Sequence, residues 1–189
     1  VTAIACADGG QESFTYEGEL LAAHTGLSGG TTRYRYDASG FPTEAIYPDG
    51  TSERWRYLNG LPVSWIDRDG ETVDYRYDGS GNLIEICYGD GTQERFVYNA
   101  DGTVAVTRDR RGATRKYQYD RWGNLEEVTD DIGLLFLAGY DKLGRMTWRS
   151  DGEGNTTRYR YTPDGLLAAV TEPGGNEITF AHDGRKDIV

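Results

Sequence analysis

Few side chains in this sequence combine into a recognisable chemical site. The 189 residues include two histidines, His24 and His182, which lie far apart in the chain. Nucleophilic catalysis needs a base held within hydrogen-bonding reach of a serine or cysteine, and the sequence supports no such set. The many acidic residues fall at glycine-rich breaks instead of forming a separate pair for acid–base chemistry. We therefore expect a protein that is not an enzyme and binds no cofactor.

The sequence offers little for metal binding. Residues 151–155 (Asp-Gly-Glu-Gly-Asn) place oxygen-bearing side chains at alternate positions, as calcium loops do, but the closing glutamate of an EF-hand is missing. We interpret this segment as a turn. The cysteines Cys6 and Cys87 are far apart in sequence and predict neither a disulfide framework nor a zinc site. We expect each to act as a small buried hydrophobic residue or to have no special role.

The composition is acidic, rich in turn residues and rich in aromatic residues. The formal net charge is −11, so nucleic acid and anionic membrane surfaces would be repelled. No apolar run is long enough for a helical membrane span. The 26 glycines and 14 tyrosines suit β-hairpins with half-buried rings, and so many aromatic residues argue against disorder.

Tyrosines recur along the sequence at a nearly constant spacing. The second tyrosine of a Tyr-x-Tyr pair, or its equivalent, falls at positions 20 or 21 residues apart: Tyr16, Tyr36, Tyr57, Tyr77, Tyr98, Tyr119, Tyr140 and Tyr161. His182 continues this series after 21 more residues. A fixed period of this length predicts one supersecondary unit copied end to end. Such arrays commonly form a surface, a spacer or a shell instead of one catalytic pocket.

Each copy contains two glycine-rich breaks. The first follows the tyrosines and supplies Gly40, Gly60, Gly81, Gly102, Gly123, Gly144 and Gly165. The second lies ten residues further on and supplies Gly50, Gly70, Gly91, Gly112, Gly133, Gly154 and Gly175. Short runs of β-forming residues between such breaks predict strands joined by tight turns, in which glycine supplies a positive φ.

One copy therefore holds two strands and two turns. About ten residues per strand and turn leave no room for a crossover helix, so neighbouring strands should be antiparallel. We predict an all-β fold: a long antiparallel meander of tandem β-hairpins, with about nine copies of the repeat and about 17 strands. Residues 1–189 are predicted to form a single array. Because strand twist accumulates, the strip must twist or curl.

The Tyr-x-Tyr spacing places both rings of a copy on one face of a strand. The tyrosines predicted to have this structural role are Tyr34, Tyr36, Tyr57, Tyr75, Tyr77, Tyr98, Tyr117, Tyr119, Tyr140, Tyr159 and Tyr161. Ala138 interrupts the column formed by the first aromatic residue of each pair. The residue between the rings is often charged or polar, as at Arg76 and Gln118, so the opposite face should be wetter.

The returning strand of each copy leaves one question open. Leu83 and Ile86, with their equivalents in other copies, lie three residues apart, so a regular strand would direct them to opposite faces. Either a β-bulge intervenes or both faces bury apolar groups.

The seventh copy is the most apolar. Residues 134–138 read Leu-Leu-Phe-Leu-Ala, where other copies are more polar. We interpret this segment as a locally buried strand, with a docking patch for another part of a larger protein as the alternative.

Two copies carry a family motif most clearly. The segments Tyr75–Leu83 (Tyr-Arg-Tyr-Asp-Gly-Ser-Gly-Asn-Leu) and Tyr117–Leu125 (Tyr-Gln-Tyr-Asp-Arg-Trp-Gly-Asn-Leu) resemble the YD repeat of Rhs, or rearrangement hotspot, proteins. The resemblance covers nearly the whole chain. It departs from the motif at Leu58 and Thr162, which replace the aspartate.

The resemblance implies a structural role. In that family, long YD arrays resemble a strip of β-sheet that spirals into a hollow shell and encloses a C-terminal toxin domain. Such arrays occur in bacterial polymorphic toxins, insecticidal toxin complexes and type VI secretion effectors. Teneurins carry related arrays. The implied partners are the rest of a parent Rhs chain and its toxin cargo. The family suggests the bacterial cytoplasm before secretion, then the extracellular space or a target cell. The family's self-cleavage region and toxin domain are not found in this sequence, so neither activity is carried over.

A binding module is the alternative reading. Exposed tyrosines and tryptophans could stack on sugar rings at a cell surface; the tryptophans are Trp55, Trp65, Trp122 and Trp148. In either case, a strip with open edge strands is predicted to self-associate through them.

Overall fold

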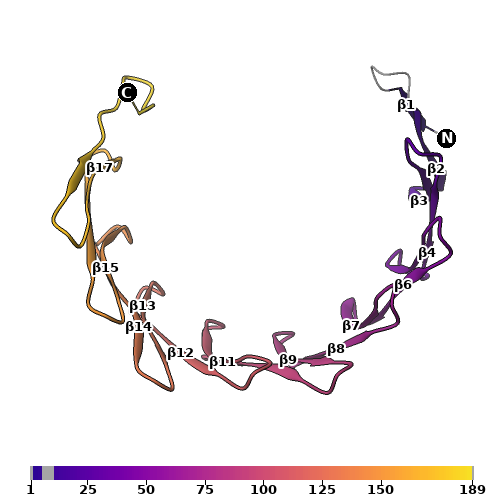
Figure 1. Ribbon diagram of the computed structural model, residues 1–189, viewed down its shortest axis with the longest axis horizontal. Helices are drawn as coiled ribbons and strands as arrows, with labels where there is room; N and C mark the ends of the chain where they lie inside the picture. The colour runs from indigo at the N-terminus through magenta and orange to yellow at the C-terminus, as the bar shows by residue number, and fades with distance from the viewer. Residues whose placement is uncertain (1, 6–10, 189) are drawn as a thin grey trace. The chain divides into compact units, whose positions relative to one another are not determined.

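The computed structural model describes residues 2–5 and 11–188, and all regular secondary structure in that part of the chain is β. It contains 18 strands, which confirms the predicted all-β meander with one strand more than expected. The chain divides into two compact units, one ending at Glu94 and the other beginning at Arg95. We describe each unit by itself (Figure 1).

The first unit is a meander of nine strands. They are β1 (Thr2–Ala5), β2 (Gln11–Glu17), β3 (Leu20–Thr25), β4 (Thr31–Tyr36), β5 (Pro42–Ile46), β6 (Ser52–Leu58), β7 (Leu61–Ile66), β8 (Thr72–Tyr77) and β9 (Leu83–Tyr88). Each strand pairs antiparallel with the next one along the chain.

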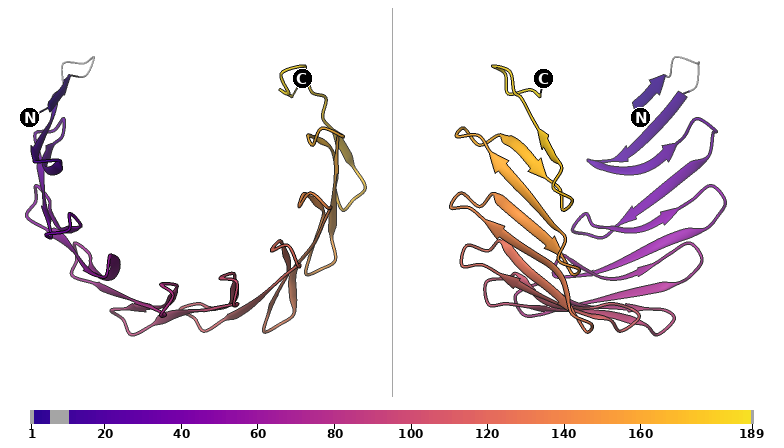
Figure 2. Two further views of the ribbon diagram at one scale, coloured as in Figure 1. Left: turned by 180° about the vertical axis from the view of Figure 1, so that it is seen from behind. Right: turned by 60° about the vertical axis from the view of Figure 1, so that its left-hand side comes forward.

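The second unit repeats the pattern. Its strands are β10 (Gln93–Tyr98, which begins just before the boundary), β11 (Val104–Arg108), β12 (Thr114–Tyr119), β13 (Leu125–Asp130), β14 (Leu134–Tyr140), β15 (Met146–Asp151), β16 (Thr156–Tyr161), β17 (Leu167–Thr171) and β18 (Glu177–Thr179). Successive strands are again antiparallel. In Figure 2 the strands of each unit form a single curved layer.

Most hairpins close through one kind of three-residue loop. In the loop after Tyr77, the Gly81 amide donates to the Asp78 carbonyl at 3.1 Å, and the Asp78 amide donates to the Asn82 carbonyl at 2.9 Å. The same pair of hydrogen bonds closes the loop at the other end of β9, between Tyr88 and Thr92. This is a type I turn followed by a left-handed residue, and Gly81 takes that position at a φ of 87°.

Two shorter turns explain why two copies have a period of 20 residues and the others 21. The copies that begin at Tyr16 and Tyr57 are one residue short. In the second of them, Leu58 pairs directly with Leu61, so the loop is Asn59-Gly60 alone. Both loop residues have positive φ, 53° and 80°, as a two-residue hairpin of this type requires.

A β-bulge in every returning strand answers the open question of the sequence. In the β8–β9 hairpin, Tyr77 pairs with Leu83 but Arg76 pairs with Glu85, so Ile84 is the extra residue. The same register shift recurs in the equivalent hairpins of both units. As a result, Leu83 and Ile86 both lie opposite tyrosines, and one face collects the apolar groups of both strands.

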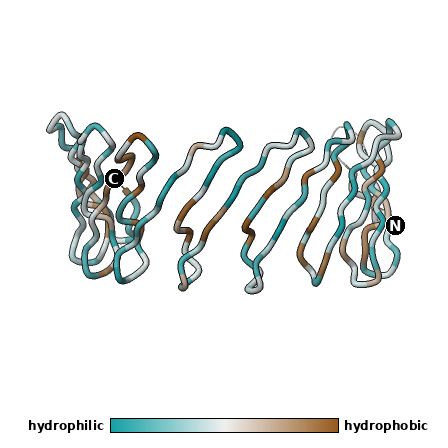
Figure 3. Tube along the Cα trace, turned by 90° about the horizontal axis from the view of Figure 1, so that it is seen from below, coloured by the Kyte–Doolittle hydropathy of each residue, from teal (hydrophilic) through white to brown (hydrophobic). Residues whose placement is uncertain are grey.

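Burial is shallow throughout the described residues. The buried apolar residues are small or medium in size: Ala45, Val128, Ala138 and Ala169. A sheet normally covers one face with a second layer, but no second layer formed by the described residues lies over either unit. Hydrophobic residues instead recur along the hairpins, between hydrophilic turns (Figure 3). The aromatic face of each unit is therefore left half-exposed.

Candidate functional site

The tyrosines predicted to be structural lie on one face of the sheet in each unit, and all of them are half-buried. In the first unit Tyr34 and Tyr36 lie opposite Ala45 and Pro42, and Tyr75 and Tyr77 lie opposite Ile86 and Leu83. In the second unit the opposed pairs are Tyr98–Val104, Tyr117–Val128, Tyr119–Leu125, Tyr140–Met146, Tyr159–Val170 and Tyr161–Leu167. Each ring thus packs across the hairpin against a smaller side chain.

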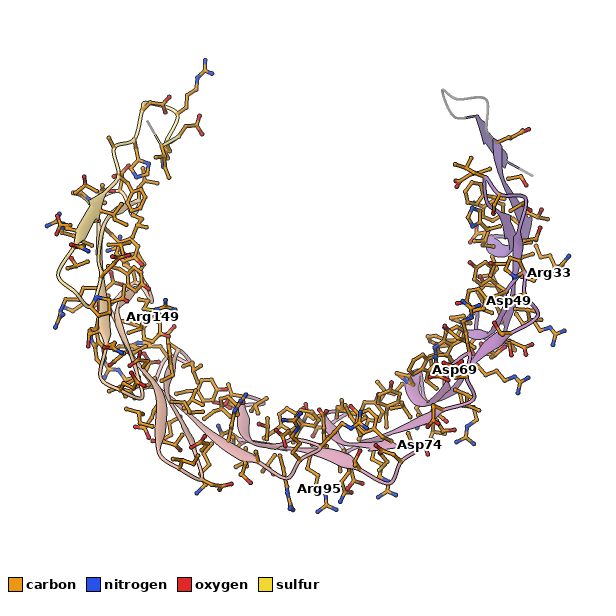
Figure 4. All side chains as sticks on the ribbon, in the orientation of Figure 1. Arg33, Asp49, Asp69, Asp74, Arg95 and Arg149 are labelled. Atoms are coloured by element: carbon orange, nitrogen blue, oxygen red, sulfur yellow. The ribbon has the colours of Figure 1, made fainter. Side chains whose placement is uncertain are left out.

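This face is the concave side of the sheet within each unit. Arg33 precedes Tyr34 and therefore points away from the tyrosines, and Figure 4 places it on the convex side of the first unit. In the second unit, Arg95 lies on the convex side, whereas Arg149, on a tyrosine-face position, lies on the concave side (Figure 4). We call the concave side the tyrosine face.

The second tyrosine of a copy also links consecutive repeats. The hydroxyls of Tyr36 and Tyr77 donate to the carbonyls of Leu21 and Pro62 at 2.9 and 2.8 Å, each 15 residues earlier in the chain. In the second unit Tyr140 and Tyr161 reach Leu125 and Met146 in the same way, at 2.8 and 2.9 Å. Each of these carbonyls lies two residues before the first residue of its strand that pairs with the next repeat, so the hydroxyl adds a hydrogen bond between repeats beyond the end of that ladder.

His182 makes the equivalent contact to a main-chain carbonyl at the end of the tyrosine series. Its Nε2 atom lies 2.8 Å from the carbonyl of Leu167, again 15 residues earlier. The other histidine, His24, stacks on Phe14 with ring centroids 4.7 Å apart and an interplanar angle of 10°. Both histidines are therefore placed as members of the aromatic columns.

Burial raises the pKa of six tyrosines of the second column, among them the four whose hydroxyls donate to a carbonyl. Desolvation is the largest cause for Tyr36, Tyr57, Tyr77, Tyr119, Tyr140 and Tyr161. Tyr57 stacks on Phe41 with centroids 5.0 Å apart. A raised pKa keeps the hydroxyls protonated, and a protonated hydroxyl is what the carbonyl acceptors require.

The aspartates after the tyrosines hold the turns. Asp78 Oδ1 accepts the amides of Ser80 and Asn82, both at 2.9 Å, and the Asn82 side-chain amide donates to Asp78 Oδ2 at 3.0 Å. The side-chain hydrogen bond from Asn82 is the main cause that lowers the pKa of Asp78. The same arrangement recurs at Asp120 with Asn124 and at Asp151 with Asn155. Residues 151–155 therefore form a turn in which the carboxylate is already hydrogen-bonded.

The opposite face carries charge pairs. Arg76 contacts Glu85 at 2.7 Å, and Glu85 is buried beneath it. Glu44 contacts Arg35 at 2.7 Å and Arg54 at 3.0 Å, so it joins two consecutive repeats. These pairs follow from the bulge, which sets Glu85 directly across from Arg76.

The seventh copy differs from the others in the side chains that it places on the two faces. Gly139 occupies the position between the two columns, and a Cβ atom there would lie 2.2 Å from Trp148 Nε1, so the indole covers the bare backbone. On the tyrosine face Ala138 pairs with Arg149, where most other copies pair an aromatic residue with a smaller one. The predicted local burial of residues 134–138 is wrong at its start, since Leu134 and Leu135 are 37% and 38% exposed. A bulge at this end displaces Leu135 from the ladder.

The described residues contain no cluster of three or more metal-ligating side chains and no helix suited to crossing a membrane. Cys87 is half-buried and unbridged, and burial raises the pKa of its thiol. Cys6 lies outside the described residues. The geometry is that of a tandem β-hairpin repeat protein, in which each hairpin adds aromatic side chains to one face of the sheet and charged side chains to the other.

Comparison with known proteins identifies the family. A model of the RHS repeat matches residues 14–52, 58–93 and 140–177, more than half of the chain. The chain therefore belongs to the RHS repeat family. No curated protein matches it.

Solved structures with the same fold include three structures of TcdB2-TccC3. The chain is 13% identical to TcdB2-TccC3-Cdc42 with a TM-score of 0.81, and 13% identical to TcdB2-TccC3-TEV with a TM-score of 0.79. It is 14% identical to TcdB2-TccC3 without its hypervariable C-terminal region, with a TM-score of 0.81. Each match covers 99% of this chain and 12% of the other, so this chain has the fold of a segment of those much longer proteins.

Sequence reasoning did not single out some residues that the structure uses. The capping aspartates follow the second tyrosine in several copies, for example at Asp78 and Asp120, and this recurrence is visible in the sequence. The partnership of Gly139 with Trp148 had no such signal, because it depends on a register that only the bulge defines.

Proposed function

We propose that this chain is a wall segment of an RHS-type shell that encloses a polypeptide cargo, and that its role is structural and not catalytic. The observation that supports this most strongly is the combination of RHS repeats over more than half of the chain with a fold that matches a segment of TcdB2-TccC3. Delivery by type VI secretion and a toxic cargo remain expectations from the family resemblance.

The mechanism of such a wall is steric. Backbone hydrogen bonds run from strand to strand, and the tyrosine hydroxyls close the gaps between repeats, so each unit forms a continuous barrier. The tyrosine columns and the turn glycines would carry this role. The tyrosine face, which is concave in each unit, would face the cargo.

Limited proteolysis of the full reading frame that contains this chain tests the proposal. A fluorescent reporter domain would replace whatever follows the repeats, and the protein would be treated with a non-specific protease. We expect the reporter to survive in the intact protein and to be digested when it is expressed without the repeats but with the same linker. Equal digestion in both cases would contradict enclosure.

A sugar-binding module is the second candidate. Among the tryptophans, Trp122 is 63% exposed at the tip of a turn, and the Arg121 guanidinium lies 4.0 Å from its ring centroid. An exposed indole of this kind can stack on a sugar ring. Specific binding on a glycan array that Trp122→Ala abolishes would support this candidate, and an array without specific binding would remove it.

A further inference from the structure

Arg149 stands out on the tyrosine face. Its position is filled by small, aliphatic or hydroxyl side chains in most other copies, including Ala45, Ile86, Val128 and Val170. The side chain is exposed, and within the described residues its guanidinium has no ion-pair partner. The arginines of the opposite face at Arg35 and Arg76, in contrast, are matched with glutamates. A lone guanidinium among aromatic columns is therefore a local exception.

Arg149 also lines a recess with an apolar wall. The recess has a volume of about 280 Å³, and its lining includes Leu135, Phe136, Arg149, Asp151, Thr157 and Pro173. All of these residues lie in the second unit, on β14, β15, β16 and the turn before β18. This volume is below the usual range of about 300–1,000 Å³ for small-molecule pockets, and it suits one or two amino-acid side chains.

The chemistry of the lining defines the occupant. A guanidinium binds a carboxylate through two parallel hydrogen bonds. The leucine, phenylalanine and proline beside it offer apolar contact for a neighbouring side chain. Asp151 adds a negative charge, but Oδ1 accepts two turn amides and Oδ2 accepts the Asn155 amide, so this carboxylate is committed to its own turn. It would disfavour a doubly charged phosphate more than a single carboxylate.

We propose that this recess, formed by the atypical seventh copy, docks an extended polypeptide segment that carries a glutamate or aspartate beside a large aliphatic or aromatic side chain. Charge complementarity with Arg149 selects the carboxylate, and Leu135, Phe136 and Pro173 receive the apolar neighbour. This goes beyond the wall role, which requires no specific contact with the cargo. The two proposals can therefore fail separately, since proteolysis tests enclosure and the experiment below tests docking.

The test is an NMR titration of the isotopically labelled 189-residue chain with two short peptides. The probes are acetyl-Gly-Leu-Glu-Leu-Gly-amide and the same peptide with glutamine in place of glutamate. We expect the glutamate peptide to shift resonances of Phe136, Arg149 and Thr157 at millimolar concentration, and the glutamine peptide to bind at least about fivefold more weakly. Equal binding of both peptides, no shifts at these residues, or stronger shifts with inorganic phosphate would each overturn the proposal.

Matched variants separate the site from overall charge. Arg149→Val introduces the residue found at the equivalent positions 128 and 170, so the fold should be kept, as an unchanged amide spectrum would verify. Arg158→Val removes the same charge from the opposite face of the neighbouring strand. We expect Arg149→Val to abolish the preference for glutamate and Arg158→Val to leave it unchanged. Loss of the preference in both variants would mean that overall charge, and not the recess, recognises the peptide.

Discussion

The hydroxyl of Tyr161 donates a hydrogen bond to the main-chain carbonyl of Met146 in the preceding repeat, with the two oxygen atoms 2.9 Å apart. The same bond recurs at Tyr36, Tyr77 and Tyr140, and His182 supplies it at the last position. The conspicuous tyrosine of the repeat therefore does two things. Its ring fills the shallow apolar face, and its hydroxyl joins one hairpin to the next where the strands separate.

Removing this hydroxyl should weaken the link between repeats. We expect Tyr161→Phe to lower the free energy of unfolding by about 0.5–1.5 kcal/mol, the usual contribution of one intramolecular hydrogen bond. Tyr159→Phe is the control, because its hydroxyl has no hydrogen-bond partner in the described part of the chain. Urea unfolding followed by tyrosine and tryptophan fluorescence measures both. A loss at Tyr159→Phe as large as at Tyr161→Phe would refute a specific role for the bridging bond.

Two glycines of one turn should respond differently to alanine. Gly81 has a φ of 87°, whereas Gly79 is not at a positive φ and has open space where a Cβ would lie. We expect Gly81→Ala to destabilise the protein by about 1–2 kcal/mol, because an L-residue in the left-handed region is strained. Gly79→Ala should be neutral or slightly stabilising. Thermal unfolding of the two variants measures the difference, and equal melting temperatures would contradict the turn geometry.

The Gly139–Trp148 contact predicts a double-mutant coupling. A Cβ at position 139 would overlap the indole, so Gly139→Ala should cost about 1–3 kcal/mol through overpacking. In a Trp148→Ala background, the same change should cost much less, because the indole is gone. Urea unfolding of the single and double variants gives the coupling energy. A coupling near zero would show that the indole does not lie against Gly139.

Stability should fall in acid through the turn aspartates. Hydrogen bonds lower the pKa of Asp78, Asp120, Asp141 and Asp151 in the folded chain. A carboxyl group with a depressed folded-state pKa stabilises the fold above its unfolded-state value, about 3.9, and this contribution is lost as pH falls through the folded-state pKa. We therefore expect the free energy of unfolding to decline below about pH 4.

Variants assign this acid dependence to particular groups. Asp120→Ala should be less stable than wild type at pH 7, and the difference should narrow as the pH approaches the folded-state pKa of Asp120. Glu126→Ala removes an exposed carboxylate of the same repeat that makes no hydrogen bond in the described residues, and it should change little. Urea unfolding at a series of pH values tests both, and a difference for Asp120→Ala that widens toward low pH would reverse the expected sign.

Open edges predict association. β18 (Glu177–Thr179) pairs with β17 alone among the described strands, and an edge with free backbone groups invites another strand. We expect the average mass in light scattering to rise with concentration. Thr179→Pro, which removes a backbone donor that points away from β17, should reduce the rise. A monomer at all concentrations would contradict this prediction.

Much of the fold could be predicted because each copy contains the residues that determine its turns and the facing of its strands. Glycine and aspartate mark the turns, as around Gly81, and the Tyr-x-Tyr spacing fixes a shared face, as for Tyr75 and Tyr77. The bulge at Ile84 could be named only as one of two possibilities, because it depends on cross-strand register. The exposure of Leu134 and Leu135 was missed for a similar reason: apolar composition normally implies burial, and here a bulge displaces Leu135 from the ladder at the start of the strand.

The proposed wall role requires the tyrosine face of this chain to line a space occupied by a cargo. The most direct measurement is photo-crosslinking in the full reading frame, with p-benzoylphenylalanine in place of Tyr159 on the tyrosine face or in place of Arg160 on the opposite face. The wall account predicts crosslinks to the cargo domain from position 159 and none from position 160. Equal crosslinking from both positions, or crosslinks from position 160 alone, would contradict it.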